Sequence, residues 1–143
     1  MKKAAGVLRD FGIAFSSRVV SAHRSPELLD TIIEECERNG TEVIIAGAGL
    51  AAHLPGVIAS KTLIPVIGVP ISTGALNGMD ALFSIVQMPK SVPVASVGVD
   101  NAANAAYLAA VILGIKYPEV RNKLADARTK TKNHLAENSA VEL

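Results

Sequence analysis

Short apolar runs rich in β-branched residues alternate with longer amphipathic stretches along the whole chain. Strand periodicity predicts extended segments at residues 14–21, 42–46, 65–69 and 92–97. Helical periodicity predicts helices at residues 2–10, 26–38, 52–61, 77–87, 101–113 and 118–136. Strands that alternate with helices in this way indicate an α/β fold, an open and doubly wound parallel sheet covered by helices on both faces.

Several residues mark where these helices begin and end. Gly12 follows the first helix as a C-terminal cap, and Asn39-Gly40 closes the second. Ser25 precedes Pro26 in the arrangement typical of a helix start. Asp100 or Asn101 caps the helix that follows the last expected strand.

The length and composition restrict the class of protein. With 143 residues, half of them hydrophobic, the chain is expected to form one domain, residues 1–143, and not to be disordered. A net charge of +1 argues against a nucleic-acid partner. The apolar stretch 102–115 is too short to span a membrane, and the N-terminus lacks the apolar run of a signal peptide. The single Cys36 excludes a disulfide framework and fits a cytoplasmic protein.

In a doubly wound sheet, ligands bind beyond the carboxyl ends of the strands, so the loops there carry the information on function. The first such loop is Ser-Ala-His-Arg-Ser-Pro at residues 21–26. Ser21, Arg24 and the free N–H groups of the next helix can form an anion site suited to a phosphate monoester. His23 beside them is a candidate for proton transfer. An equally open interpretation is a capped helix start with an exposed His and Arg.

The second loop is the Gly-rich segment 46–56. Gly47 and Gly49 allow close backbone approach to a phosphate or a planar ring. A dinucleotide fingerprint would need a third Gly at Ala52, so that interpretation is not supported. His53 can be a second polar group of the pocket or a hydrogen-bonded structural histidine.

The third loop spans residues 70–78, Pro-Ile-Ser-Thr-Gly-Ala-Leu-Asn-Gly. It is long enough to form a lid or wall for a ligand, but an ordinary loop with helix-capping residues is the simpler interpretation. No metal site is expected, because His23 and His53 have no carboxylate or thiolate at ligand spacing.

Together these loops resemble the class I N5-carboxyaminoimidazole ribonucleotide mutases, the PurE family of purine biosynthesis. The matching strings are Val-Ser-Ala-His-Arg-Ser-Pro at 20–26, Ala-Ala-His-Leu-Pro-Gly at 51–56, Pro-Val-Ile-Gly-Val-Pro at 65–70, Leu-Asn-Gly-Met-Asp-Ala-Leu at 76–82, Ser-Ile-Val-Gln-Met-Pro at 84–89 and Asn-Ala-Ala-Asn-Ala-Ala at 101–106. The resemblance covers nearly the whole chain, and the succession of strings is more specific than any one of them.

The resemblance implies a three-layer flavodoxin-like α/β/α domain that forms a homo-octamer. It implies an isomerase that needs no metal, ATP or organic cofactor and moves a carboxylate from the exocyclic nitrogen to C4 of an imidazole ribonucleotide. His23 would be the general acid/base. The residues implied to contact the substrate are Ser21, Ala22, Arg24, Ala48, Gly49, Ala51, His53 and Leu54.

Three features depart from the family pattern. The family opens with a strand and a Gly-Ser-x-Ser-Asp loop, and both are missing here, so we expect the native chain to begin one strand and one loop earlier. Leu50 stands where the family usually has Gly, and at a positive φ it would be strained. Lys90-Ser91 replaces a Gly-Gly turn. The alternatives to a mutase are a direct aminoimidazole ribonucleotide carboxylase, an inactive ribonucleotide-binding remnant, and a scaffold without a site.

Overall fold

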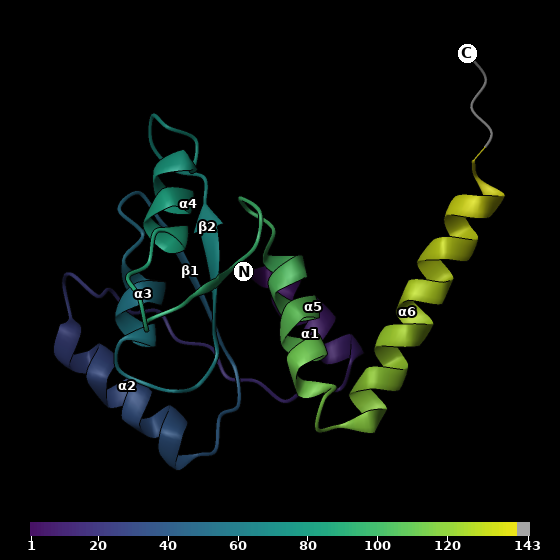
Figure 1. Ribbon diagram of the computed structural model, residues 1–143, viewed down its shortest axis with the longest axis horizontal. Helices are drawn as coiled ribbons and strands as arrows, with labels where there is room; N and C mark the ends of the chain where they lie inside the picture. The colour runs from purple at the N-terminus through teal and green to yellow at the C-terminus, as the bar shows by residue number, and fades with distance from the viewer. Residues whose placement is uncertain (140–143) are drawn as a thin grey trace.

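A three-stranded parallel sheet forms the centre of the protein, in a computed structural model that describes residues 1–139 (Figure 1). The strands are β1 (Ile44–Gly49), β2 (Val66–Ile71) and β3 (Ala95–Ser96), in the order β1-β2-β3. Ile44 pairs with Val66 and Gly49 with Ile71, so β1 and β2 run side by side over their full length. The parallel sheet between helices confirms the predicted α/β class.

Six helices accompany the sheet within residues 1–139, and most agree with the predicted ranges. They are α1 (Lys2–Asp10), α2 (Pro26–Arg38), α3 (Leu54–Ala59), α4 (Met79–Val86), α5 (Ala102–Leu113) and α6 (Pro118–Glu137). The expected stop signals are confirmed at Gly12 and Gly40, which have φ values of +70° and +68°. The Asn101 side chain accepts a hydrogen bond from the backbone N–H of Asn104 and caps α5. Ser25 precedes α2, but its side chain makes no capping hydrogen bond.

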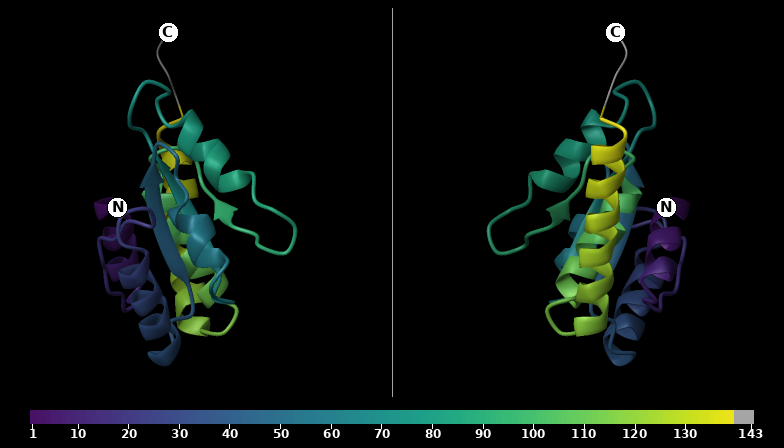
Figure 2. Two further views of the ribbon diagram at one scale, coloured as in Figure 1. Left: turned by 90° about the vertical axis from the view of Figure 1, so that its left-hand side faces the viewer. Right: turned by 90° about the vertical axis from the view of Figure 1, so that its right-hand side faces the viewer.

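The alternation of side chains along the strands creates two cores. Ile67 and Val69 of β2 point to one face, where they pack with Leu8 of α1 and the alanines of α5. Ala46 of β1 and Val66 of β2 point to the other face, against α2 and α3. Figure 1 shows the layers side by side, with α1 and α5 on the opposite side of the sheet from α3 and α4, and Figure 2 views the same stack from its two outer sides.

Small side chains allow α5 to lie close to its neighbours. Ala105, Ala106, Ala109 and Ala110 are buried, and α1 runs beside this helix (Figure 1). A final cluster, made by Phe11, Ala110, Val120 and Leu124, fixes the first half of α6 to this layer. The second half of α6 is exposed and extends away from the sheet (Figure 1).

The strand predicted at residues 14–21 is wrong. Residues 13–20 have no strand assignment, and no backbone–backbone hydrogen bond joins residues 14–20 to β1. Instead a cavity of about 940 Å³ is lined both by this segment and by residues 43–47, with Leu8 and Leu29 among the apolar residues around it. An extended segment becomes a strand only when a neighbouring edge pairs with its backbone. Among residues 1–139, no such neighbour lies against this segment.

The strand predicted at 92–97 is shorter than expected, because only Ala95 and Ser96 pair with β2. Pro93 has no N–H to donate to a ladder, which limits pairing at the start of this segment. Within residues 1–139, no helix is both long and apolar enough to cross a membrane.

Candidate functional site

The three loops singled out by sequence meet at the carboxyl end of the sheet. His23, from the loop before α2, and His53, directly before α3, lie in hydrogen-bond contact: His23 Nε2 and His53 Nδ1 are 2.7 Å apart. Their rings are nearly perpendicular, at 87°, with centroids 4.9 Å apart. Residues 30 positions apart therefore form one imidazole pair.

The third loop lies against the second. A Cβ placed on Gly49 would clash with the Thr73 hydroxyl and would lie 3.1 Å from the backbone carbonyl oxygen of Ile71. A Cβ on Gly74 would lie 2.7 Å from the Leu50 side chain. Gly49 and Gly74 thus permit a close approach that any larger residue would disturb. The loop at 70–78 borders the Gly-rich loop, as a wall would.

The loop before α2 is a compact turn organised around Ser21. The backbone carbonyl of Ser21 accepts the N–H of Ser25 at 2.9 Å. The Ser21 hydroxyl accepts the backbone N–H and the Nε–H of Arg24, both at 3.3 Å. These contacts hold the guanidinium beside the hydroxyl at the start of α2, and both side chains have atoms open to solvent. A hydroxyl, a guanidinium and helix N–H groups in this arrangement suit a phosphate monoester.

The remaining predicted residues fall into two groups. Ala22 and Leu54 are half-buried, and their side chains pack against the core between the sheet and helices α2 and α3. Ala48 packs against Ala52 and α4, while Ala51 is exposed beside His53. The structure therefore brings the backbone of the Gly-rich loop, and not a row of polar side chains, next to the histidine pair.

Leu50 has φ +55°, the left-handed conformation in which a branched side chain is strained. Its side chain is 55% exposed, so little burial compensates for that strain. Ser91, the second residue of the Lys90-Ser91 pair that replaces a Gly-Gly turn, also has a positive φ, +79°. Both positions have the backbone geometry that glycine adopts most easily.

One polar contact at this end of the sheet was missed. Asp100 accepts hydrogen bonds from the backbone N–H and the hydroxyl of Ser72, which is in the loop after β2. These bonds lower the pKa of the Asp100 carboxyl, the hydroxyl bond contributing most. Asp100 was a candidate for capping α5, but Asn101 performs that role. The signal available in the sequence was an acidic residue three positions after the strand predicted at 92–97.

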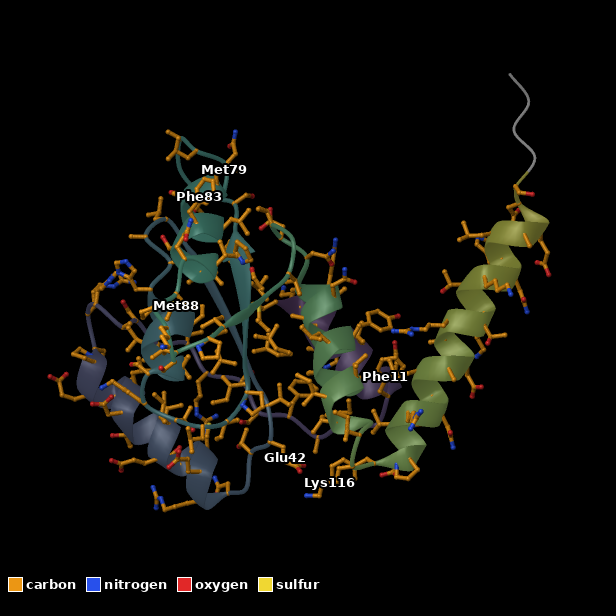
Figure 3. All side chains as sticks on the ribbon, viewed as in Figure 1. Phe11, Glu42, Met79, Phe83, Met88 and Lys116 are labelled. Carbon is orange, nitrogen blue, oxygen red and sulfur yellow. The ribbon has the colours of Figure 1, made fainter. Side chains whose placement is uncertain are left out.

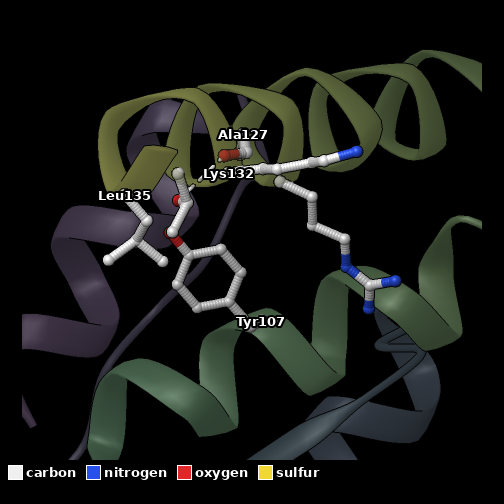
Figure 4. A pocket seen from close by; sticks show the side chains of 6 residues that line it. Tyr107, Ala127, Lys132 and Leu135 are labelled. Carbon is white, nitrogen blue, oxygen red and sulfur yellow. Dashed lines mark hydrogen bonds between the residues drawn. The ribbon is translucent and has the colours of Figure 1, made fainter. Parts of the chain in front are cut away.

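A second hollow, of about 390 Å³, lies between α5 and α6 (Figure 4). Tyr107, Ala127, Arg128, Thr131, Lys132 and Leu135 line it. It is remote in sequence from all three loops and contains no pair of groups suited to proton transfer. Among residues 1–139, no three His, Cys, Asp or Glu side chains are grouped so that they could hold a metal ion.

Comparison with known proteins agrees with this arrangement. The family model described as AIR carboxylase matches residues 1–134. The N5-carboxyaminoimidazole ribonucleotide mutase of Pyrococcus abyssi is 59% identical over 132 residues, which cover 92% of this chain and 76% of that protein. The Escherichia coli K12 protein of the same name is 49% identical over 140 residues, covering 96% and 83%.

A solved structure has the same fold. The crystal structure of Treponema denticola PurE superimposes with a TM-score of 0.88 at 26% sequence identity, and the match covers 96% of this chain and 85% of that one. Since the family model and the relatives each match nearly the whole chain, this protein belongs to the AIR carboxylase (PurE) family.

Proposed function

We propose that this protein is an N5-carboxyaminoimidazole ribonucleotide mutase, an isomerase of purine biosynthesis formed by a single domain. The observation that carries the proposal is the imidazole pair of His23 and His53 beside Ser21 and Arg24, in a chain 59% identical to a mutase of that name. A proton-transfer group next to an anion site is what an isomerisation of a ribonucleotide needs. The reaction leaves the number of protons on the substrate unchanged.

The chemistry can be written so that bonds and protons balance. The bond between the exocyclic nitrogen and the carboxylate carbon breaks, CO₂ leaves, and the nitrogen takes a proton from His23. C4 of the ring then attacks CO₂ and forms the new carbon–carbon bond. The proton on C4 returns to His23, which is restored to its starting state. His23 is therefore the catalytic residue, acting first as acid and then as base.

The other residues bind the substrate. The Ser21 hydroxyl and the Arg24 guanidinium hold the phosphate, with Ala22 between them in the same turn. Ala48, Gly49 and Ala51 form the wall of the ring and CO₂ pocket, and His53 and Leu54 close it. Because these side chains are small, the backbone of the wall can lie close to the bound CO₂ and leave no room for water. A pocket open to water would lose the CO₂.

The first experiment is a turnover assay of the purified chain with N5-carboxyaminoimidazole ribonucleotide. We expect the C4-carboxylated product to form, and the His23→Asn variant to lose activity by at least about 10²-fold. His134→Asn is the matched control, since this histidine lies on α6 and, within residues 1–139, its ring forms a hydrogen-bond contact only with Asn138 at the end of that helix. Equal activity of His23→Asn and the unmodified protein would contradict the assignment of His23.

A second arm of the assay separates the alternatives. It supplies aminoimidazole ribonucleotide and CO₂, with bicarbonate as the source of the CO₂. These are the substrates of a direct carboxylase, to which the description of the matching family model corresponds. Faster turnover of this mixture than of N5-carboxyaminoimidazole ribonucleotide would overturn the mutase. Ribonucleotide binding without turnover of either substrate would identify a binding protein that is not an enzyme.

We propose further that the chain forms a homo-octamer in the cytoplasm. In support, Met79, Phe83 and Val86 of α4 and Val111 of α5 are large apolar side chains left exposed on the single chain. Met79 and Phe83 are labelled on α4 in Figure 3. Exposed apolar patches of this kind mark contact surfaces. Sedimentation equilibrium tests the assembly, and a monomer mass at assay concentration would contradict it.

A further inference from the structure

The contact between His23 and His53 restricts the protonation state of both rings. A neutral imidazole carries one N–H and one lone pair, so in a hydrogen bond between two rings one nitrogen donates and the other accepts. The contact uses Nε2 of His23 and Nδ1 of His53. Nδ1 of His23 makes no side-chain hydrogen bond within residues 1–139. That nitrogen is the one left to face a ligand.

We infer that His53 is a positioning residue for His23: its Nδ1 accepts the Nε2–H of His23 and so keeps the Nδ1 lone pair of His23 open toward the reacting atoms. This inference rests on the proposed function for its chemical role. The hydrogen bond itself can be tested without any substrate.

The direction of the hydrogen bond follows from the two states that the reaction requires of His23. As a base, His23 needs an unprotonated Nδ1, and its single proton is then on Nε2. As an acid, it carries protons on both nitrogens. In both states Nε2–H of His23 can donate to an unprotonated Nδ1 of His53, so this hydrogen bond is present throughout the catalytic cycle.

The opposite direction fails in both states. If His53 donated its Nδ1–H to Nε2 of His23, the neutral His23 would carry its proton on Nδ1 and could not accept one there. Protonation of His23 would then place two N–H groups against each other at 2.7 Å. The hydrogen bond from His23 Nε2–H to His53 Nδ1 also becomes stronger when His23 is charged, because charged donors form stronger hydrogen bonds than neutral ones.

Three substitutions of His53 test whether His23 needs a hydrogen-bond acceptor at the position of His53 Nδ1 or only a side chain of similar size there. The amide of Asn reaches the position of Nδ1, so His53→Asn keeps an acceptor for His23. The amide of Gln lies one bond farther out, near the position of Nε2, and Leu offers no acceptor. We expect kcat to fall about 10²-fold in His53→Gln and His53→Leu with KM changed less than about threefold, and His53→Asn to retain kcat within about tenfold of the unmodified protein. Equal kcat for the Asn and Leu variants would overturn the inference.

Nitrogen NMR of the ¹⁵N-histidine-labelled protein gives a readout that does not depend on turnover. The chain has three histidines, and His134 on α6 is an internal reference. At about pH 8.5, above the range in which imidazoles ordinarily titrate, we expect His23 to carry its proton on Nε2 and to show a ¹⁵N–¹⁵N coupling across the hydrogen bond to His53 Nδ1. The coupling should disappear in His53→Leu. His134, whose ring contacts the Asn138 amide and no second imidazole within residues 1–139, should show no such coupling in either protein. A neutral His23 protonated on Nδ1 would overturn the inference. If the expected coupling is found but no carboxylated product forms, the proposed function fails while the hydrogen-bond direction stands.

Discussion

Ser72 donates its backbone N–H and its hydroxyl to the carboxylate of Asp100, and this pair fixes the loop after β2 to the turn before α5. The N–H of Asp100 in turn donates to the carbonyl oxygen of Pro70 at 2.9 Å. Asp100 has φ +57°, a conformation that Asp tolerates better than most residues. The loop at 70–78 therefore begins from a fixed point, next to the Gly-rich loop.

The carboxylate form of Asp100 should stabilise the folded protein. Its pKa is lowered in the folded state by the hydroxyl and backbone hydrogen bonds of Ser72. A group whose pKa is lowered on folding contributes stability above its ordinary pKa and loses that contribution as the pH falls through the folded value. Asp100→Asn should thus lower the free energy of unfolding at pH 7, and the difference from the unmodified protein should shrink as the pH falls below about 5.

Denaturant unfolding at a series of pH values measures this effect. Asp126→Asn is the control, since Asp126 is an exposed carboxylate on α6. We expect the control to leave the pH dependence of unfolding unchanged. A stability loss in Asp100→Asn that is the same at every pH would show that the carboxylate charge is not responsible.

Unlike the substitution of Asp100, a substitution that relieves the backbone strain at Leu50 should stabilise the folded protein. A residue other than Gly in the left-handed region costs about 1–3 kcal/mol. Because Leu50 is 55% exposed, Leu50→Gly should raise the free energy of unfolding by about 1 kcal/mol after the greater flexibility of unfolded Gly is counted. Leu50→Ala keeps the positive φ and removes the same exposed side chain, so it should give no comparable gain. If Ala stabilises as much as Gly, the side chain and not the backbone is the cause.

Local signals in the sequence predicted the helices well. The start of α2 at Pro26 and its end before Gly40 depend on residues within one turn of those points. The segment at 14–21 shows the limit of such signals. Its composition favours a strand, but strand formation depends on a partner edge that local sequence cannot supply, and Val19 is fully exposed.

The site was predictable as a set of residues but not as a geometry. The order of strands and loops was enough to select His23 and His53, because ligand-binding loops of parallel sheets follow the strands. The contact between their rings depends on how two loops 30 residues apart turn toward each other. The contact between Ser72 and Asp100 was missed for the same reason, since 28 residues separate them.

The packing of α6 against α1 and α5 should depend on the N-terminal half of α6. Leu124 is buried against Phe11 and Val120, whereas Leu135 on the same helix is 65% exposed. Phe11 lies between α5 and α6 (Figure 3). Leu124→Ala should destabilise the protein by about 2–4 kcal/mol through loss of burial and the cavity left behind, and Leu135→Ala by less than about 0.5 kcal/mol. Thermal unfolding of both variants checks this, and similar losses would mean that the outer half of α6 is packed in solution.

A polar contact supports the same region from the far end of the sheet. The Glu42 carboxylate accepts hydrogen bonds from Lys116 Nζ and the Tyr117 hydroxyl, each at 2.8 Å (Figure 3). The Lys116 bond contributes most to lowering the pKa of Glu42. This contact joins the segment before β1 to the turn between α5 and α6. Its partners are open to solvent, so we assign the attachment of α6 mainly to Leu124.

Arg24 should act on substrate binding and not on the chemical step. Its guanidinium is held beside the Ser21 hydroxyl, where we place the substrate phosphate. A hydrogen bond to a charged group of this kind is worth about 10- to 100-fold in binding. Arg24→Gln should therefore raise KM for N5-carboxyaminoimidazole ribonucleotide by that factor and change kcat by less than about threefold. Arg121→Gln, an exposed change on α6, is the control.

A substrate without its 5′-phosphate makes this test specific. If Arg24 contacts the phosphate, Arg24→Gln should lower kcat/KM for the phosphorylated substrate. It should leave kcat/KM for the dephosphorylated nucleoside unchanged, because the partner of the guanidinium is already absent. If Arg24 instead orders the loop that carries His23, the substitution should lower kcat for both substrates by the same factor. An equal loss of kcat/KM with and without the phosphate would remove Arg24 from the phosphate site and assign it to the support of His23.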